Sequence, residues 1–566
     1  MCIRDRSRDK KSIFITFNIN EGDKYKINDV DVVGDIPFEE AIYKDIVESL
    51  KDTTYSQAQI TGIEEYFINI LGNRGYAFAE VAGNPEIDEE SNEVKLIFSV
   101  QPGNRTYTRK ILFTGNNITQ DQVLRREMRQ FEGAWTSDNA IEAGKVRLER
   151  LGYFKEVSVE TIPVPGTDDQ IDISYSVEEE TTGSIGGNIG YSDFGLMLGF
   201  NLQEQNFLGS GNTVGIGINK NIYSEMYNIS YMNPYATRDG VSLGYNLYFR
   251  ETDYGEFNVA NYLTNSNGFG AQFGYPISDI TRLGFNITYD KTDIDVGSLP
   301  AREIYDFVSA EGNIFETLSA QLSWQRVTLN RGLFPTDGAS TVLSFSSTIP
   351  GSDLSYYRLN VRQRYYQPLT QNLVFGFQGE LGYLNAYGDT EETPFFQNFY
   401  AGGPRSLRGF ESNTLGPRST DAPCYEFNYA EGTCPNLLDI DGDGELDTPY
   451  YNPYANQTSR YRDAPIGGNI KIEGSLQLIF KLPFIEDQRS LRSAFFFDFG
   501  NVFSDNCKEY QINCSEPSID DLRYSYGVGI TWITGFGPMS LAIAKPTNAG
   551  PRERTEEFQF TVGNVF

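Results

Sequence analysis

The segment Phe558-Gln-Phe-Thr-Val-Gly-Asn-Val-Phe566 alternates apolar and polar residues up to the final position of the sequence. Side chains of a β-strand point alternately to its two faces, so Phe558, Phe560 and Val562 share one face. An uncovered edge strand promotes aggregation in an open sheet, whereas the last strand of a closed barrel pairs with the first. The segment therefore predicts the closing strand of a barrel. An ordinary terminal strand of a soluble sheet is the alternative.

The same alternation recurs from about residue 181 onward, and it favours a barrel that crosses a membrane. The residues between the apolar positions are often Gly, Ser, Asn and Gln, which suit a water-filled lumen. Tight turns and long loops alternate between these segments, and their spacing predicts about sixteen antiparallel strands. The clearest segments are Val241–Phe249, Phe269–Tyr275, Leu283–Tyr289, Phe375–Tyr383, Phe495–Phe499 and Tyr526–Trp532. We expect an all-β transmembrane barrel.

Composition is compatible with a barrel and excludes helical membrane spans. The 566 residues include 36 Tyr, 39 Phe and 55 Gly, which suit aromatic girdles and crowded strands. A soluble β-sandwich could share this composition. No uncharged apolar run approaches the ~18 residues that a membrane-spanning helix requires.

Charge and residue usage narrow the function classes. The chain has 46 Lys and Arg against 77 Asp and Glu, a formal net charge of −31. Nucleic acid is therefore not the expected partner, because phosphate contacts require clusters of Lys and Arg. The chain has no His, so no Ser/His or Cys/His catalytic arrangement can form.

The N-terminal third contains a repeat. The segments Tyr25–Asp35 and Tyr107–Asn116 lie about 80 residues apart, and each reads as a short strand that ends at a Gly turn. Amphipathic helices follow, such as Thr119–Arg129, and then two more strands, which gives a β-α-α-β-β unit. The expected domains are the last strand of a preceding unit at 1–22, repeats at 23–102 and 103–180, and the barrel at 181–566.

The first residues point to a longer parent protein. Met1–Arg6 is charged and lacks the apolar core of a signal peptide, so we expect it to lie outside the fold and the chain to begin inside a larger protein. Ser12–Ile19 alternates like the closing strand of an earlier repeat.

Four cysteines fall into two close pairs, Cys424 with Cys434 and Cys507 with Cys514. Each pair lies in a polar segment between strands, which predicts two short-range disulfides in an oxidising compartment. A tetrathiolate zinc site is the alternative, although neither pair has the spacing of a zinc knuckle.

A cluster of carboxylates suggests a calcium site. Asp439, Asp441, Asp443 and Asp447 occupy positions 1, 3, 5 and 9 of a loop like that of an EF-hand. Position 12 is Tyr450 rather than Glu, and flanking helices are absent. A solvated acidic surface is therefore the alternative to calcium binding.

The longest interruption of the strand pattern, 402–466, begins with Gly402-Gly-Pro-Arg-Ser-Leu-Arg-Gly-Phe410. This segment is too apolar to extend into water, so we expect it to fold back into the lumen. Arg408 then requires an acceptor, because a desolvated unpaired charge is costly. A surface arginine beside a flexible glycine is the alternative.

This loop resembles the corresponding loop of the BamA family of outer-membrane assembly factors, with Leu407 where that family has Val. Further segments agree with the family: Arg331–Gly338, Phe399–Gly403, Phe497–Gly500, Phe558–Gly563 and, in the second repeat, Val123–Trp135. The resemblance covers 7–566. It implies two periplasmic POTRA domains, the last of five, and a sixteen-stranded barrel in the bacterial outer membrane.

The resemblance also implies a function. Members of the family insert unfolded β-barrel proteins into the outer membrane through a lateral gate between their first and last strands. No bond chemistry is involved, so the chain is expected to be neither an enzyme nor dependent on a cofactor. The gate strands would be Gly183–Tyr191 and Phe558–Phe566, with Gly183, Gly187, Tyr191, Phe558, Phe560 and Phe566 as gate residues.

Partners and further site residues follow from the same resemblance. The loop would be locked to the barrel through Arg408, Gly409 and Phe410, with Asp498 as the acid that pairs with Arg408. The family's second acid corresponds to Gln477 here. An accessory lipoprotein like BamD would dock at Arg125 and Glu132, near the end of an exposed helix. Unfolded barrel substrates and outer-membrane lipid are the other expected partners.

Two other functions compete with barrel insertion. A secretion pore that exports one partner protein also combines POTRA repeats with a barrel, but the match at Val123–Trp135 favours an insertase. A passive solute porin needs no repeats, so 23–180 argues against it.

Overall fold

A computed structural model describes residues 2–6, 13–17, 24–192, 195–257, 259–260, 262–296, 301–420, 464–482, 485, 489–508, 511, 514–534 and 537–563. The chain divides into two compact units. One comprises Met1–Thr182 with Leu208–Ser210, and the other comprises Gly183–Phe207 with Gly211–Phe566.

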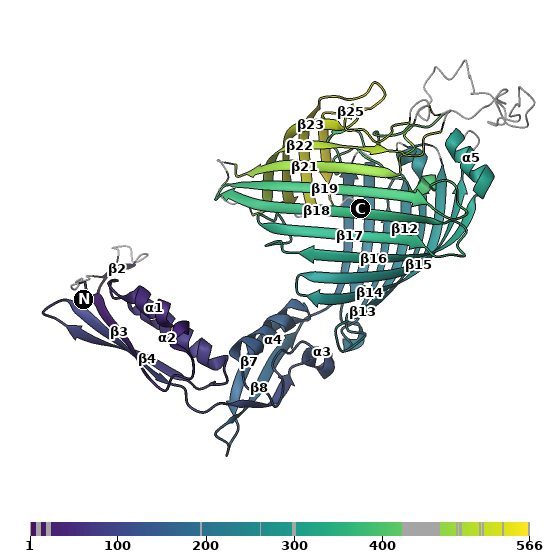
Figure 1. Cartoon of the computed structure of the whole chain (residues 1–566). Coiled ribbons are helices and arrows are strands. Elements are labelled where there is room, and N and C mark those ends of the chain that lie inside the picture. Colours follow the sequence, from purple (N-terminus) through teal and green to yellow (C-terminus); the bar gives the residue numbers. More distant parts are fainter. Residues whose placement is uncertain are drawn as a thin grey trace, which may run out of the picture. The chain divides into compact units, whose positions relative to one another are not determined.

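The larger unit is a closed barrel of sixteen antiparallel strands (Figure 1), which confirms the predicted fold class. Strands follow one another in chain order, and β26 returns to β9. The strands are β9 Gly183–Ser192, β10 Gly195–Glu204, β11 Thr213–Lys220, β12 Ser224–Asn233, β13 Ser242–Asp253, β14 Leu263–Ser278, β15 Thr281–Asp295, β16 Ile314–Val327, β17 Gly338–Thr348, β18 Tyr356–Thr370, β19 Leu373–Ala386, β21 Ile470–Phe480, β22 Leu491–Phe503, β23 Arg523–Thr534, β24 Gly537–Pro546 and β26 Phe558–Val562.

Alternation along these strands produces an apolar outer face. Tyr231, Tyr245 and Phe269 lie side by side on β12, β13 and β14, with ring centroids 6.3 Å and 6.0 Å apart. Residues directly opposite in an antiparallel pair share a face, so the register places these rings in one row. Residues at intervening positions, such as Thr292 and Asp498, are buried inside the barrel.

The strands differ in length around the barrel. The longest is β14 with 16 residues, and β15 and β18 each have 15. Strands β9 and β10, next to the closure, have 10 residues each, and β26 has 5.

Connections at one end of the barrel are mostly short, and those at the other end are mostly long. The longest joins β19 to β21 and contains β20 Gly409–Phe410, which pairs with β25 Thr555–Glu556. Helix α5 Arg302–Glu311 belongs to another long connection and packs Ile304 and Phe307 into a cluster with Tyr262, Phe315 and Phe395. The 3-10 turns of this unit and its connections are η2 Phe207–Gly209, η3 Tyr254–Phe257 and η4 Phe395–Gln397.

The smaller unit contains two β-α-α-β-β repeats, the order that the sequence predicts. Each repeat forms a three-stranded sheet, ordered β3-β5-β4 in one and β6-β8-β7 in the other, and buries a separate core. Figure 1 shows α1 and α2 beside the first sheet and α4 beside the second. The elements are β3 Lys26–Gly34, η1 Glu40–Ile42, α1 Lys44–Leu50, α2 Gln57–Gly72, β4 Glu80–Asp88, β5 Glu93–Gln101, β6 Tyr107–Thr114, α3 Asp121–Arg125, α4 Asp138–Arg150, β7 Phe154–Pro163 and β8 Gln170–Glu179. Within the described ranges, no helix has the length and apolarity to cross a bilayer.

Two local expectations are wrong. The helix expected at Thr119–Arg129 ends at Arg125, because the Gln130 amide donates to the carbonyls of Phe131 and Trp135 and organises a loop. Residues 2–6, expected to lie outside the fold, form β1 Cys2–Arg6, which pairs with β2 Ile13–Phe17. Pairing in a β-ladder joins backbone groups and needs no particular side chains. The charged composition of residues 2–6 therefore did not predict this strand.

Candidate functional site

The connection between β19 and β21 returns into the barrel as a luminal loop, residues 399–419. Three isolated bridges shape it: Phe399 to Gly468, Ala401 to Leu415, and Arg418 to Pro465. Its apolar residues pack into one buried cluster with the barrel wall. The cluster comprises Leu384, Phe399, Ala401, Leu407, Phe410, Leu415 and Val502.

Arg408, in this loop, forms a two-pronged ion pair with Asp498 on β22. Its Nε and Nη2 donate to the two carboxylate oxygens over 2.7 Å each, and its backbone N–H donates to Oδ2 over 3.2 Å. The Asp498 side chain is 0% exposed. A planar guanidinium matches a carboxylate in this way, and a desolvated pair of this kind fixes position as well as charge.

Neighbouring side chains complete the environment of Arg408. Nη2 also donates to Ser475 Oγ at 3.0 Å, and the guanidinium lies 3.4 Å from the centre of the Phe496 ring. Gln477 Nε2 donates to the same Ser475 Oγ at 3.2 Å, so Gln477 reaches Arg408 through Ser475. One carboxylate, one hydroxyl and one aromatic face therefore surround the cation.

Gly409 and Phe410 connect the loop to the last barrel strand. Gln559 on β26 accepts from the Gly409 N–H at 3.3 Å and donates to the Phe410 carbonyl at 2.8 Å. Gly409 has φ +91°, and a Cβ there would lie 3.1 Å from Ala544 Cβ. A side chain at this position would be both strained and crowded, so glycine permits the close approach.

The seam between β9 and β26 has the fewest residue pairs of any junction in the described part of the barrel. Within 183–192 and 558–563, the parts of both strands that the structure describes, a single residue pair, Val562 with Tyr191, joins them. By contrast, β9 pairs with β10 over ten residues, and β26 pairs with β24 over five. The predicted gate residues Gly183, Gly187 and Tyr191 lie on β9, Phe558 and Phe560 lie on β26, and Phe566 lies outside the described residues. Among the described residues, most of the facing edges of β9 and β26 are thus unpaired with one another.

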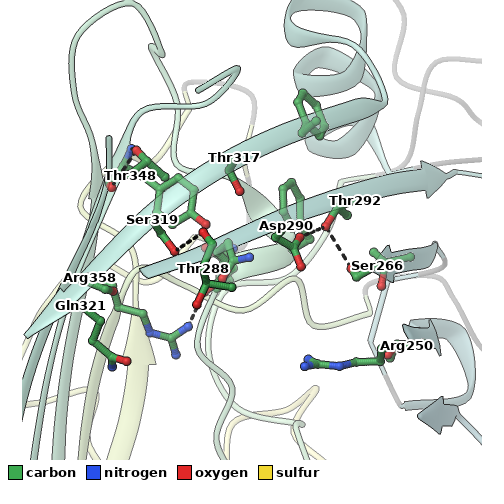
Figure 2. Close-up of a pocket in the computed structure, with 18 of the residues that line it drawn as sticks. Arg250, Ser266, Thr288, Asp290, Thr292, Thr317, Ser319, Gln321, Thr348 and Arg358 are labelled. Atoms are coloured by element: carbon green, nitrogen blue, oxygen red, sulfur yellow. Dashed lines mark hydrogen bonds between the residues drawn. The ribbon is translucent and has the colours of Figure 1, made fainter. Parts of the chain in front are cut away.

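A polar cavity of about 490 Å³ occupies another part of the lumen. Figure 2 shows its hydroxyl-rich wall, in which Thr292 donates to Asp290 at 2.6 Å and lies 2.9 Å from Ser266. Arg358 donates to the Gln397 carbonyl at 3.5 Å. These groups hydrogen-bond to one another and suit a hydrated lumen, as expected from the polar positions of the strands.

The second repeat brings Arg125 and Glu132 together. Arg125 ends α3, and Glu132 lies in the following turn rather than on a helix. The two side chains form an ion pair at 3.0 Å, and Glu132 also accepts from the Ile111 N–H at 2.8 Å. The Ile111 N–H and, after it, Arg125 lower the pKa of Glu132 against the opposing effect of partial burial.

The remaining predicted residues divide between described and undescribed segments. Cys507 and Cys514 form a disulfide with a Cα–Cα distance of 5.7 Å. Cys424, Cys434 and the carboxylates Asp439, Asp441, Asp443 and Asp447 lie outside the described residues.

Sequence reasoning missed Ser475, Phe496 and Gln559 as parts of this site. Gln559 was placed on the polar face of the last strand, and that face is the one that meets the loop. Its partner Phe410 is 149 residues away, and only the strand register brings them together. The alternation of β26 was therefore the available signal, but it did not identify the partner.

Comparison with known proteins places this geometry in a family. Residues 206–566 match the Omp85 superfamily domain, and residues 25–103 and 106–180 each match the POTRA model, described as a surface antigen variable number repeat. The outer membrane protein assembly factor BamA of Neisseria meningitidis is 28% identical over 99% of this chain and 69% of its own length. BamA of Buchnera aphidicola is 31% identical over 56% of this chain and 53% of its own length.

A solved structure agrees with these sequence matches. The crystal structure of BamA from Haemophilus ducreyi lacking POTRA domains 1–3 has a TM-score of 0.76 and 30% identity, and it covers 95% of this chain and 99% of that chain. This likeness confirms the resemblance that the sequence motifs predict. The chain therefore belongs to the Omp85 superfamily, as a BamA-like barrel protein of the bacterial outer membrane with periplasmic POTRA repeats.

Proposed function

We propose that this chain assembles β-barrel proteins and inserts them into the outer membrane through the seam between β9 and β26. The single observation that carries the proposal is the junction of β9 and β26, where the described residues form one pair, whereas the other neighbouring barrel strands pair over five residues or more. The names of its BamA relatives, outer membrane protein assembly factors, support the same function.

An open seam offers a template for a new strand. Unpaired N–H and C=O groups on a strand edge bind an extended segment through main-chain hydrogen bonds, whatever its sequence. Strand β9 contains Gly183, Gly186, Gly187 and Gly190, which provide few side-chain contacts to hold β26 in place. A substrate strand can therefore replace β26 at this edge. The process requires no bond chemistry and no cofactor.

The luminal loop would set the position of the last strand. Gln559 holds β26 from inside the barrel, and Arg408 anchors the loop to Asp498 on β22. This arrangement keeps β26 on the β24 side, while its described edge toward β9 has one residue pair. We infer that Arg408, Gly409 and Phe410 lock the barrel around the seam.

An accessory lipoprotein of the BamD kind is proposed to dock at Arg125 and Glu132. Both side chains are partly exposed, and both already pair with each other. Replacing Glu132 by Lys would therefore disturb the Ile111–Glu132–Arg125 network as well as a partner contact. A docking test needs Glu132→Gln beside Glu132→Lys. Loss of co-purification in both variants, with rescue of the Lys variant by an opposite charge on the lipoprotein, is the expected result.

Depletion in the native bacterium tests the proposed function. A general fall of outer-membrane barrel proteins is the expected result, measured by quantitative proteomics of isolated outer membranes. Loss of one secreted protein with unchanged barrel levels would instead support the alternative, a secretion pore for a partner protein.

A further inference from the structure

A cavity of about 750 Å³ opens at the periplasmic end of the barrel, where β16–β17, β18–β19 and β21–β22 are connected. Its lining includes four cationic side chains, Arg331, Lys481, Arg489 and Arg492. Among the described residues that line it there is no Asp or Glu. Clustered cations create a positive potential that attracts anionic groups.

Arg492 is the member of this cluster with a buried guanidinium nitrogen that makes no hydrogen bond to the described residues. It starts the inward-facing series of β22 that continues through Ala494 and Phe496 to Asp498. Its guanidinium lies 4.7 Å from the centre of the Tyr366 ring, and its Nη2 is buried with no hydrogen-bond partner among the described residues. A buried donor left unsatisfied costs stability, and more so when it is charged.

Two other luminal arginines have a carboxylate partner. Arg408 has Asp498 at 2.7 Å, and Arg523 has Glu553 at 2.7 Å. A carboxylate thus holds each of these two arginines, whereas Arg358 donates to the Gln397 carbonyl and lies 4.1 Å from the centre of the Phe399 ring. Among the described residues no acid pairs with Arg492, and its Nη2 remains available to an acceptor on a second molecule.

Arg492 also faces the site described above. A second cavity, of about 240 Å³, shares Arg492 and Phe334 with the first and is lined by Arg408, Gln559 and Thr561. Arg492 therefore lies between the periplasmic mouth and the last strand of the seam. A group bound there would sit next to the edge at which we propose that substrate strands add.

We propose that Arg492, with Arg331 and Lys481 at the mouth, binds a carboxylate on an incoming β-strand of a barrel substrate. This inference rests on the proposed function and names the chemical feature of the substrate that the barrel recognises. A planar guanidinium pairs with a carboxylate through two parallel hydrogen bonds, as Arg408 does with Asp498.

The cavity wall favours a polypeptide over a lipid headgroup. Val374 and Ile479 line it and lie opposite one another on the inward faces of β19 and β21, whereas their neighbours Phe375 and Leu478 pair on the outer face. A lipid would have to withdraw its chains from the bilayer to reach an inward site. An unfolded barrel strand already combines apolar side chains with carboxylates, as β15 does around Asp290.

A peptide-binding experiment tests the proposal without requiring insertion. The probe is the labelled decapeptide of residues 286–295, Asn-Ile-Thr-Tyr-Asp-Lys-Thr-Asp-Ile-Asp, and its control carries Asn at all three Asp positions. Binding is measured by fluorescence anisotropy to the full chain in nanodiscs of phosphatidylcholine. Arg492→Gln is compared with Arg282→Gln, which removes a periplasmic-end arginine of β15 that does not line the cavity.

Arg492→Gln should weaken binding by about tenfold or more, the loss expected for a charge-assisted hydrogen bond. Arg282→Gln should bind the Asp peptide with the affinity of the wild type. The Asn peptide should bind the wild type weakly, with an affinity equal to that of the Asp peptide for Arg492→Gln. Arg492→Lys keeps the positive charge but cannot form two parallel hydrogen bonds to a carboxylate. Its affinity for the Asp peptide should lie between those of the wild type and Arg492→Gln. Heat-modifiable gel mobility establishes that each variant is folded. The Asn peptide tests the same contact with the wild-type protein, so its result does not depend on the folding of a variant.

Three results of the peptide measurements would overturn the assignment, and a fourth comes from lipid competition. The first three are no binding by the wild type, equal binding of the two peptides, or equal binding by wild type and Arg492→Gln. Displacement of the peptide by phosphatidylglycerol in the discs, seen with wild type and absent with Arg492→Gln, would also overturn it in favour of a phosphate site. Each of these leaves the proposed function standing, since only unchanged barrel levels after depletion contradict that function.

Discussion

At the scale of single residues, the Arg408–Asp498 pair has the clearest energetic consequence. Removing one partner of a buried ion pair leaves the other charge desolvated, which costs about 3–5 kcal/mol. We predict that Arg408→Ala loosens the luminal loop, because Asp498 is fully buried. The variant should lose heat-modifiable gel mobility at a lower temperature than wild type, and trypsin should cut the loop faster. Arg405→Ala, an exposed position of the same loop, is the control; equal behaviour of the two variants would contradict the prediction.

Glu132 provides a pH-dependent test. Its pKa is lowered in the folded state, first by the Ile111 N–H and then by Arg125, from an ordinary value of 4.5. A carboxylate with a depressed pKa stabilises the fold above its unfolded pKa and loses that contribution as the pH falls through the folded value. Wild type should therefore resist urea better than Glu132→Gln at pH 7, and the difference should shrink below pH 4.5. Tryptophan fluorescence, which includes Trp135 nearby, follows the transition. A constant difference across this range would show that the carboxylate charge is not responsible.

The same residues show how far sequence reasoning reaches. Arg408 was singled out because a charge inside an apolar loop must find an acceptor, and the family resemblance pointed to Asp498. Ser475 and Gln559 were not found, because they lie 67 and 149 residues from their partners in the loop. Strand alternation predicts which face a residue occupies, but the partner across the lumen depends on the register of many strands.

At the scale of elements, a disulfide cross-link between β9 and β26 can test the role of the seam. Tyr191 and Val562 lie directly opposite one another, and antiparallel pairs of this kind have Cα atoms about 4.5–5.5 Å apart, within the range of a disulfide. We predict that Tyr191→Cys with Val562→Cys blocks barrel assembly when oxidised and recovers on reduction. Growth and outer-membrane barrel levels in a strain that depends on the variant provide the measurement.

The matched control places the cross-link one strand away. Tyr191→Cys with Leu196→Cys joins β9 to β10, a junction that is already paired over ten residues. This variant should assemble barrels with or without oxidant. Equal inhibition by both cross-links would argue that β9 must move as a whole and that the seam has no special role.

Elements were the best predicted level of the structure. The period-two alternation in 181–566 identified the strands because outward positions need apolar side chains and inward positions tolerate polar ones. The helix at Thr119–Arg129 was overextended because an apolar stripe continues to Met128, which is buried although it lies beyond the end of α3. The apolar stripe records which side chains are buried. A loop can bury an apolar side chain such as Met128 as well as a helix can.

At the scale of the whole molecule, the two units should unfold separately. The repeats bury their own clusters around Phe67 and Tyr175, whereas the barrel depends on its closed ladder and on clusters such as that around Phe410. Domains with independent cores show separate transitions. In urea, we predict loss of the helical circular-dichroism signal at a concentration that leaves the barrel folded by gel mobility. A single coincident transition would contradict this.

The unequal strand lengths have a consequence for the surrounding bilayer. A strand rises about 3.4 Å per residue and tilts about 45° in a membrane barrel, so the 16 residues of β14 cover about 38 Å of membrane thickness and the 10 residues of β9 only about 24 Å. Lipid beside the seam therefore meets a shorter apolar wall, and hydrophobic mismatch is relieved by local thinning of the bilayer. A thinner hydrocarbon layer lowers the cost of carrying unpaired backbone groups across it. The short side of this barrel would weaken the membrane at the seam, where we propose that new barrels enter.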